Sequence, residues 1–452
     1  MNILGTPTLV CYQQAKHSGD CTFQTFPTNA KPTMKKSAPK RSKTMAILKG
    51  VVFDLDGTLV RSNLDTQTLY PKVLGTDVLK SCNISTEVQS IEKPEERVRA
   101  QQIIHIFADE SRQKMTFMPG CVELLTYLSL QNIPTALTSN SRKDADFFCE
   151  QLQLLKESAQ NWGQEAPPDL SFRRIITRDD QESDLKSVEI LAKECFNCEC
   201  SEIIVVGNSV TNHLGLWKKA GAKTALLAKR AADGADLCVQ HLTELPKNLW
   251  KIFFIDGPLG NTPENDYGLF HRSPQPKPQS ELCQAVANGD LPKIRDVLKS
   301  LSLDEITKPD DNGNTALIWA AETGNVAVGK LIVEDVLEKS IPTHNIQRRL
   351  ANFQNHRGYL GATALNRAAR RNHTDFLEFL LREGDRFDMN LPNYKMQYPL
   401  HFCANKKNPE ALDCLLMCGA NPWVLDRKGR TPLEDSKCKT CDNLLLAAMS
   451  VC

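Results

Sequence analysis

The stretch 51-VVFDLDGTLV-60 decides the fold of the N-terminal part of this chain. Three apolar residues lead directly into Asp54 and Asp56, and Gly57 follows. This pattern predicts a buried strand of a parallel sheet with two carboxylates at its carboxyl end, which is where open α/β sheets bind ligands. Gly57 suits the turn that must follow, because it adopts a positive φ at little cost. An acidic turn would also use Asp and Gly, but it does not require the apolar run before them.

The two aspartates suit a nucleophile beside an acid or base. Asp54 can attack phosphorus to form an aspartyl-phosphate, and Asp56 can protonate the leaving oxygen and later activate water. The run resembles the first motif of the haloacid dehalogenase (HAD) superfamily, whose members are mostly Mg²⁺-dependent phosphatases. The resemblance implies a doubly wound α/β domain over residues 48–255 that hydrolyses a phosphomonoester on a small phosphorylated metabolite, with Mg²⁺ as cofactor.

Two further motifs implied by the resemblance concern the phosphate. The segment 133-IPTALTSNSRKD-144 reads as an apolar strand ending in Thr138, which the resemblance places on a phosphoryl oxygen. In 178-RDDQESDLKSVEIL-191, Lys186 is the candidate for the lysine that neutralises the phosphoryl group, although serine follows it where the family usually has proline. The alternatives are a strand leading into a turn for Thr138 and a solvated helix residue for Lys186.

The fourth motif departs from the family. The segment 201-SEIIVVGNSVTNHLGLWKKAGAKTALL-227 predicts a buried strand, a polar turn after Gly207 and a helix. Asn208 and Asn212 stand where the resemblance implies metal-binding carboxylates, and Mg²⁺ prefers charged oxygen ligands. Asp54, the backbone carbonyl of Asp56 and these amides could hold Mg²⁺ when the substrate's phosphate bridges it. Alternatively the site has lost turnover and only binds.

The residues between the first two motifs predict an inserted domain. The segment 95-EERVRAQQIIHIFADESRQKM-115 has the apolar spacing of an amphipathic helix. It resembles the small helical cap of HAD phosphatases, here at about residues 62–118, which implies a lid that closes over the aspartates and selects the substrate. Residues 118–120 resemble the return to the core, and 235-ADLCVQHLTELPKNL-249 resembles the end of the same fold.

Beyond a linker at 256–279 that is rich in Gly, Pro and Asn, the sequence pattern changes. Similar runs begin at Thr315 (TALIWAAETGN), Thr363 (TALNRAARRNH), Tyr398 (YPLHFCANKKN) and Thr431 (TPLEDSK). The last two lie one ankyrin period apart. With an earlier unit at 281–300, they make residues 280–452 resemble an all-α ankyrin-repeat solenoid, in which helix pairs are stable only when stacked. A generic bundle of helical hairpins is the alternative.

The repeats carry further predictions. We expect these side chains to be buried between neighbouring repeats: Leu365, Phe376, Leu377 and Leu380. We expect a left-handed backbone at three turn positions: Gly324, Asn372 and Gly419. The long interval between Thr315 and Thr363 predicts that residues 338–360 bulge as a loop. Because ankyrin arrays bind proteins and carry no catalytic groups, the resemblance implies a protein partner for this part of the chain.

Composition limits the function classes. The chain has 452 residues, of which 41% are hydrophobic and 24% are charged, values that fit a soluble protein of two or three domains. Its net charge of +1 gives no overall bias toward nucleic acid or anionic membranes. No apolar run approaches the roughly 18–20 residues that a membrane span needs.

The 16 cysteines are scattered along the chain, which fits reduced thiols in the cytoplasm. Cys195, Cys198 and Cys200 form one cluster, and Cys438 and Cys441 form another. Either could supply two ligands to zinc, but neither offers four at zinc spacing, so free thiols are favoured.

Residues 1–47 differ in composition from the rest. They contain one acid, Asp20, among many Lys, Ser, Thr and Pro residues, and we interpret them as a disordered basic segment. An organelle transit peptide, or a nuclear signal in the run KKSAPKRSK, is the alternative to a cytoplasmic location.

Two functions follow from the sequence. The first is a HAD-type phosphatase with an ankyrin tail that binds protein. The second is a catalytically impaired HAD-like scaffold whose main role is protein binding through the ankyrin repeats.

Overall fold

The computed structural model describes residues 45–61, 69, 71–73, 88–161, 169–177, 188–209, 214–228, 234–255, 277–340, 346–382 and 387–451. The chain separates into two compact units, one made of Ile47–Glu157 with Pro168–Leu245 and one that contains Pro246–Cys452. All but the last three residues of the predicted N-terminal segment 1–47 and of the linker 256–279 lie outside the described residues. In the part of the chain that is described, no helix is long and apolar enough to cross a membrane.

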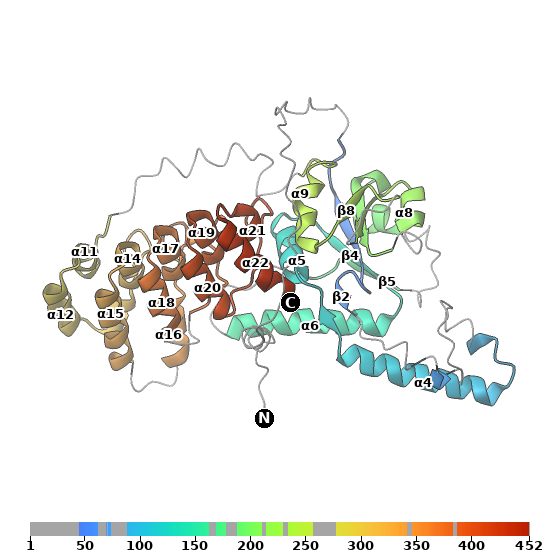
Figure 1. Ribbon diagram of the computed structural model, residues 1–452, viewed down its shortest axis with the longest axis horizontal. Coiled ribbons are helices and arrows are strands. Elements are labelled where there is room, and N and C mark those ends of the chain that lie inside the picture. Colours follow the sequence, from blue (N-terminus) through green and yellow to red (C-terminus); the bar gives the residue numbers. More distant parts are fainter. Residues whose placement is uncertain are drawn as a thin grey trace. The chain divides into compact units, whose positions relative to one another are not determined.

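A six-stranded sheet forms the centre of the first unit (Figure 1). Its strands are β1 (Gly50–Asp54), β4 (Thr135–Ser139), β5 (Arg174–Thr177), β6 (Ile203–Gly207), β7 (Lys223–Leu227) and β8 (Leu237–Val239). They pair in parallel in the order β5-β4-β1-β6-β7-β8. The chain therefore winds from β1 toward one edge of the sheet, returns to the other side of β1 and winds toward the opposite edge. The predicted doubly wound α/β fold is confirmed.

The apolar run before the aspartates is the reason that β1 lies at the centre. Val51, Val52 and Phe53 are fully buried. Val52 lies beside Ala136 of β4 and Val205 of β6, and all three belong to one hydrophobic core. The helical elements of this unit, besides the inserted helix, are α5 (Cys121–Leu130), α6 (Arg142–Asn161), a π-helical turn at Leu191–Cys195, α8 (Gly215–Lys219), α9 (Leu245–Leu249), which crosses the boundary of the unit, and two 3₁₀ turns at Cys200–Glu202 and Leu242–Glu244.

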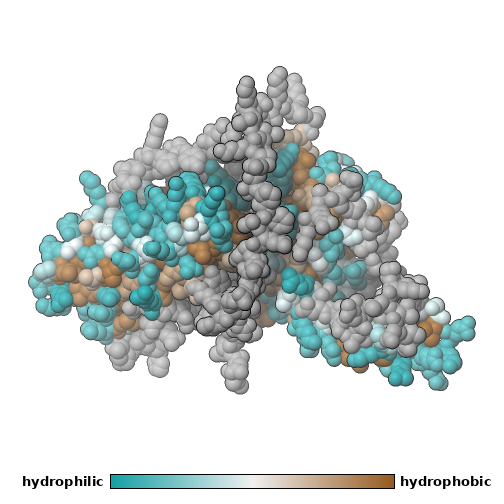
Figure 2. Space-filling model, in the orientation of Figure 1, coloured by the Kyte–Doolittle hydropathy of each residue, from teal (hydrophilic) through white to brown (hydrophobic). Residues whose placement is uncertain are grey.

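The predicted insertion begins and ends at a short antiparallel ribbon of β2 (Val60–Arg61) and β3 (Thr116–Phe117). The backbone N–H of Met118 donates to the carbonyl of Leu59 at 2.8 Å, so the two ends of the insertion lie side by side. Between them, α4 (Pro94–Gln113) confirms the predicted helix. Its described surface is mostly hydrophilic (Figure 2), and its only fully buried residue is Ala100. Most of residues 62–87 lie outside the described residues.

The second unit is built from paired helices stacked side by side (Figure 1). Its helices are α11 (Glu281–Asn288), α12 (Leu291–Ser300), α13 (Leu303–Thr307), α14 (Ala316–Thr323), α15 (Val326–Lys339), α16 (Ile346–Gln354), α17 (Ala364–Arg371), α18 (Thr374–Arg382), α19 (Pro399–Lys406), α20 (Pro409–Met417), α21 (Pro432–Asp435) and α22 (Lys439–Val451), with a 3₁₀ turn at Tyr359–Gly361. In Figure 1, α14, α17 and α19 form one row and α15, α18 and α20 a second row. This arrangement confirms the predicted solenoid.

The local predictions for the repeats are also confirmed. Leu365, Phe376, Leu377 and Leu380 are at most 1% exposed. The backbone is left-handed at the three predicted turn positions, with φ of 75° at Gly324, 66° at Asn372 and 92° at Gly419. The hydroxyls of Thr315 and Thr363 cap α14 and α17 by accepting the backbone N–H three residues on.

The prediction that residues 338–360 bulge as a loop is wrong. Helix α15 continues to Lys339, and Ile346–Gln354 forms the additional helix α16. Leu350 and Phe353, three residues apart, are 4% and 5% exposed and join the hydrophobic core of the repeats. The extra length of this interval is therefore a helix held by its own apolar face.

Candidate active site

The loop after β1 holds the two predicted catalytic carboxylates. Asp54 is the last residue of β1, and the chain then turns tightly, with the Gly57 N–H donating to the Val60 carbonyl at 2.8 Å. Gly57 has φ of 72°, the left-handed conformation expected for it. Both aspartates are half-buried. They stand at the carboxyl end of the strand from which the sheet winds in two directions, where ligands of such folds bind.

The end of β6 lies directly against this loop. A Cβ atom built on Gly207 would lie 3.7 Å from the Cβ of Asp54. A Cβ atom built on Gly57 would lie only 2.0 Å from Nδ2 of Asn208, so the amide of this exposed residue packs on the turn that follows Asp56. The structure therefore brings Asn208 to the two aspartates, although the residues are far apart in the sequence.

Thr138 comes from the neighbouring strand on the other side. It pairs with Asp54 in the register between β1 and β4, and its backbone carbonyl accepts a hydrogen bond from the Leu55 N–H at 2.9 Å. Its half-buried hydroxyl donates to the carbonyl of Phe53 at 3.2 Å. Thr138 thus lies beside the nucleophile candidate, with its hydroxyl bonded to the strand.

Two residues that the sequence analysis did not assign also act on the site. Burial raises the pKa of Asp56 above its ordinary value, and the negative charge of Asp144 raises this pKa further. A hydrogen bond with the side chain of Asn140 lowers it in part. Asn140 and Asp144 follow β4 within residues 133–144, the segment that also contains Thr138. Their polar side chains just beyond the end of the strand were the sequence feature that could have identified them as site residues. A raised pKa favours the protonated carboxyl that a general acid needs.

Asp144 in turn binds the inserted helix. Arg112, in the last turn of α4, donates from Nε to Oδ1 of Asp144 at 2.7 Å and from Nη1 to Oδ1 of Asp109 at 2.6 Å. The Arg112 and Asp144 side chains are 15% and 24% exposed, so this ion pair is partly shielded from water. Because Asp144 acts on Asp56, the pair connects the insertion to the site.

Two predicted site residues, Lys186 and Asn212, lie outside the described residues. Within the described ranges, no three His, Cys, Asp or Glu side chains come together as a metal site. The cysteine cluster 195–200 packs at the edge of a hydrophobic core, and burial raises the pKa of Cys198 to about 11. The cysteines of both clusters are free thiols in the structure.

Known proteins resemble this chain in both its N-terminal region and its C-terminal repeats. Residues 282–393 match a family model of ankyrin repeats in three copies. The N-terminal region is similar to a haloacid dehalogenase-like hydrolase domain-containing protein of Arabidopsis thaliana, with 29% identity over 197 residues, which are 42% of this chain and 74% of the plant protein. The central parallel sheet agrees with that similarity. The chain thus joins a HAD-like domain to a C-terminal array of ankyrin repeats.

Proposed function

We propose that the HAD-like domain is a phosphatase that hydrolyses a small phosphorylated metabolite through an aspartyl-phosphate, and that the ankyrin repeats bind a partner protein. The observation that carries the enzymatic part is the pair of half-buried carboxylates, Asp54 and Asp56, at the carboxyl end of the central strand. Two carboxylates in different environments are what a nucleophile and a general acid require.

The two aspartates divide the reaction between them. An oxygen of Asp54 attacks phosphorus as the bond to the leaving oxygen breaks, and the protonated Asp56 gives its proton to that oxygen. Asp56, now a carboxylate, takes a proton from water, which attacks the phosphorus of the aspartyl-phosphate and restores Asp54. The raised pKa of Asp56 supports the first role, since it keeps the carboxyl protonated at a higher pH.

The residues around the loop fit a divalent cation. Asp54 and the carbonyl of Asp56 offer hard oxygen ligands, and the Asn208 side chain lies against the same turn. Mg²⁺ is commonly bound by one or two carboxylates together with substrate phosphate and water, so this set suffices when substrate is present. When bound, Mg²⁺ would neutralise charge between the carboxylates and the phosphoryl oxygens. Thr138 and Lys186 are proposed to hold the phosphate.

A second function is favoured by one observation. Asn208, which contacts the loop, is a neutral amide at a position where the HAD resemblance implies a carboxylate. The domain would then be an impaired scaffold, and the ankyrin repeats would carry the function by binding protein.

Phosphate release by the full-length protein separates the two functions. A panel of phosphorylated metabolites is assayed with and without Mg²⁺, for the wild type, Asp54→Asn and the control Asp146→Asn, whose exposed aspartate lies on α6. The phosphatase hypothesis expects Mg²⁺-dependent release that Asp54→Asn abolishes and Asp146→Asn retains. No release from any substrate, or equal release by Asp54→Asn, would contradict it.

A further inference from the structure

A basic groove runs across the ankyrin unit. It has a volume of about 390 Å³ and is lined by α17, α19 and α21 and by the segments that precede these three helices. Six of its cationic side chains come from these elements and from the residues just after α21: Arg370, Lys395, Lys406, Arg427, Lys428 and Lys437. We call this cavity the basic groove.

The acidic residues of the basic groove are already engaged. Its two carboxylates, Asp426 and Asp435, are 2% and 9% exposed, and both bind Arg430, the seventh cation of the lining. Seven cations against two carboxylates leave the lining with a net charge of +5, whereas the whole chain carries +1. The positive charge is therefore local to this surface, and it attracts groups of opposite sign.

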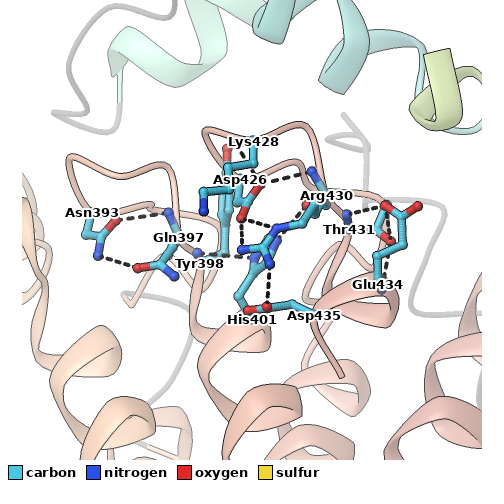
Figure 3. A network of polar contacts seen from close by, with 10 residues as sticks. All are labelled: Asn393, Gln397, Tyr398, His401, Asp426, Lys428, Arg430, Thr431, Glu434 and Asp435. Atoms are coloured by element: carbon cyan, nitrogen blue, oxygen red, sulfur yellow. Dashed lines mark hydrogen bonds and ion pairs between the residues drawn. The ribbon is translucent and has the colours of Figure 1, made fainter. Parts of the chain in front are cut away.

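Partly buried hydrogen bonds hold the loops that carry these cations (Figure 3). Oδ1 of Asp426 accepts the backbone N–H groups of Lys428 and Arg430 at 2.8 and 2.9 Å. Nε2 of the fully buried His401 lies 2.9 Å from the Arg430 carbonyl. Burial lowers the pKa of His401. Its Nδ1 accepts the backbone N–H of Tyr398 at 3.4 Å, so Nε2 carries the ring hydrogen and donates to the Arg430 carbonyl.

The preceding loop is built in the same way. Oδ1 of Asn393 accepts the backbone N–H groups of Lys395 and Gln397, each at 2.9 Å. Both loops therefore present their cations on a backbone that is fixed before any ligand arrives. Such preorganisation lowers the conformational entropy that the loops would otherwise lose when a ligand binds.

We propose that the basic groove binds an acidic peptide segment of a partner protein. Carboxylates of such a segment would meet the cations at the rim, where charge complementarity sets the association rate and the choice of partner. The half-buried ring of Phe402 offers an apolar contact, and the amides of Gln397 and Asn405 can hydrogen-bond to a peptide backbone. Single-stranded nucleic acid fits less well, since its binding sites stack successive bases on several aromatic rings and Phe402 is the one aromatic residue of this lining.

This inference deepens the protein-binding part of the proposed function. It is tested by fluorescence anisotropy with the full-length protein. The probes are a labelled glutamate-rich peptide, the same peptide with glutamine at each glutamate, and a labelled single-stranded oligonucleotide. Arg370→Glu with Lys406→Glu reverses two exposed charges of the groove. Arg295→Glu with Lys330→Glu makes the same change at exposed positions outside its lining.

The acidic peptide is expected to bind the wild type and the control variant alike. Its Kd should rise about ten-fold or more in the groove variant, which corresponds to about 1.4 kcal/mol for two attractive contacts turned repulsive. The Kd of the glutamine peptide for the wild type should be at least as high as the Kd of the acidic peptide for the groove variant. If the reversal variant fails to melt cooperatively, Arg370→Gln with Lys406→Gln replaces it, with a smaller expected rise.

Three outcomes would overturn the proposal: equal binding of the glutamine peptide, the same Kd in the groove and control variants, or tighter binding of the oligonucleotide than of the acidic peptide. Phosphate release is measured on the same preparations. Because peptide binding does not depend on turnover, failure of the phosphatase hypothesis and failure of the groove hypothesis give different results.

Discussion

Substitution of Gly57 by alanine tests the contact between the aspartate loop and Asn208. The new Cβ would lie 2.0 Å from Nδ2 of Asn208, whereas real Cβ contacts stay beyond 3.0 Å, so the end of the Asn208 side chain must retreat by at least 1 Å. The backbone φ of 72° at this position adds a second cost, because alanine rarely adopts it.

The two costs fall on different measurements. The left-handed backbone costs an alanine roughly 1–2 kcal/mol. For a unit of about 200 residues this lowers the Tm by about 2–8 °C. The amide is the flexible end of an exposed side chain, so its displacement adds little to that loss. If Asn208 helps to hold Mg²⁺, however, its displacement raises the Mg²⁺ concentration that gives half-maximal phosphate release.

The assay measures thermal unfolding and Mg²⁺ titrations for four variants: Gly57→Ala, Asn208→Ala, the double variant and Gly221→Ala. Gly221, in the same unit, has φ of 94°, and the nearest atom to its built Cβ is 3.9 Å away, so its substitution reports backbone strain alone. We expect Gly57→Ala and Asn208→Ala each to raise the Mg²⁺ concentration that gives half-maximal phosphate release. The double variant should raise it no further than Asn208→Ala does. An unchanged Mg²⁺ curve in Gly57→Ala would refute the placement of Asn208 as a metal neighbour.

Three further predictions concern charge and packing. Asp144→Asn removes a negative charge that raises the pKa of Asp56, so the loss of activity on the alkaline side of the pH–rate profile should begin at a lower pH, while Asp146→Asn leaves the profile unchanged. Phe376→Ala, at a position that is 0% exposed, should lower the free energy of unfolding of the ankyrin unit by about 3–5 kcal/mol in chemical denaturation. Burial depresses the pKa of His401, so the folded protein favours the neutral ring. The resulting stabilisation is complete above the unfolded pKa of about 6.5 and declines as the pH falls below that value. His401→Gln should therefore flatten the dependence of Tm on pH.

Each of these predictions has an outcome that contradicts it. An alkaline limb that does not move in Asp144→Asn would remove that carboxylate from the electrostatics of the site. If Phe376→Ala lowers the free energy of unfolding by less than about 1 kcal/mol, the effect is that of an exposed position, and the residue is not buried between repeats. The account of His401 fails if the variant and the wild type lose Tm equally between neutral and acidic pH.

The fold was predictable from the sequence where a local pattern and a buried position coincide. The apolar run before Asp54 predicted β1 because its side chains are those that the sheet buries. The Thr-x-Leu starts predicted the helix pairs because the threonine caps a helix and the leucine is buried. Residues 338–360 show the limit of this reasoning. The repeat period predicted an excess of residues there but not their conformation, and the spacing of Leu350 and Phe353 was a helical signal overlooked in favour of a loop.

The sequence predicted that four of the candidate residues lie close together, but it did not predict their electrostatics. The resemblance named Asp54, Asp56, Thr138 and Asn208, which the structure brings to the carboxyl ends of three adjacent strands. The effect of Asp144 on Asp56 could not be read from the sequence, because it depends on how the start of α6 approaches the loop after β1. The ion pair of Arg112 with Asp144 likewise requires the folded path of the insertion.

The central claim is that Asp54 attacks phosphorus, and covalent labelling tests it most directly. The full-length protein is mixed with a substrate that it hydrolyses in the presence of Mg²⁺, quenched in acid and digested, and the peptides are analysed by mass spectrometry. The account predicts one added phosphoryl group on the peptide that contains Asp54 and none in Asp54→Asn. Phosphate release without a labelled Asp54 peptide, or a label on another residue, would contradict it.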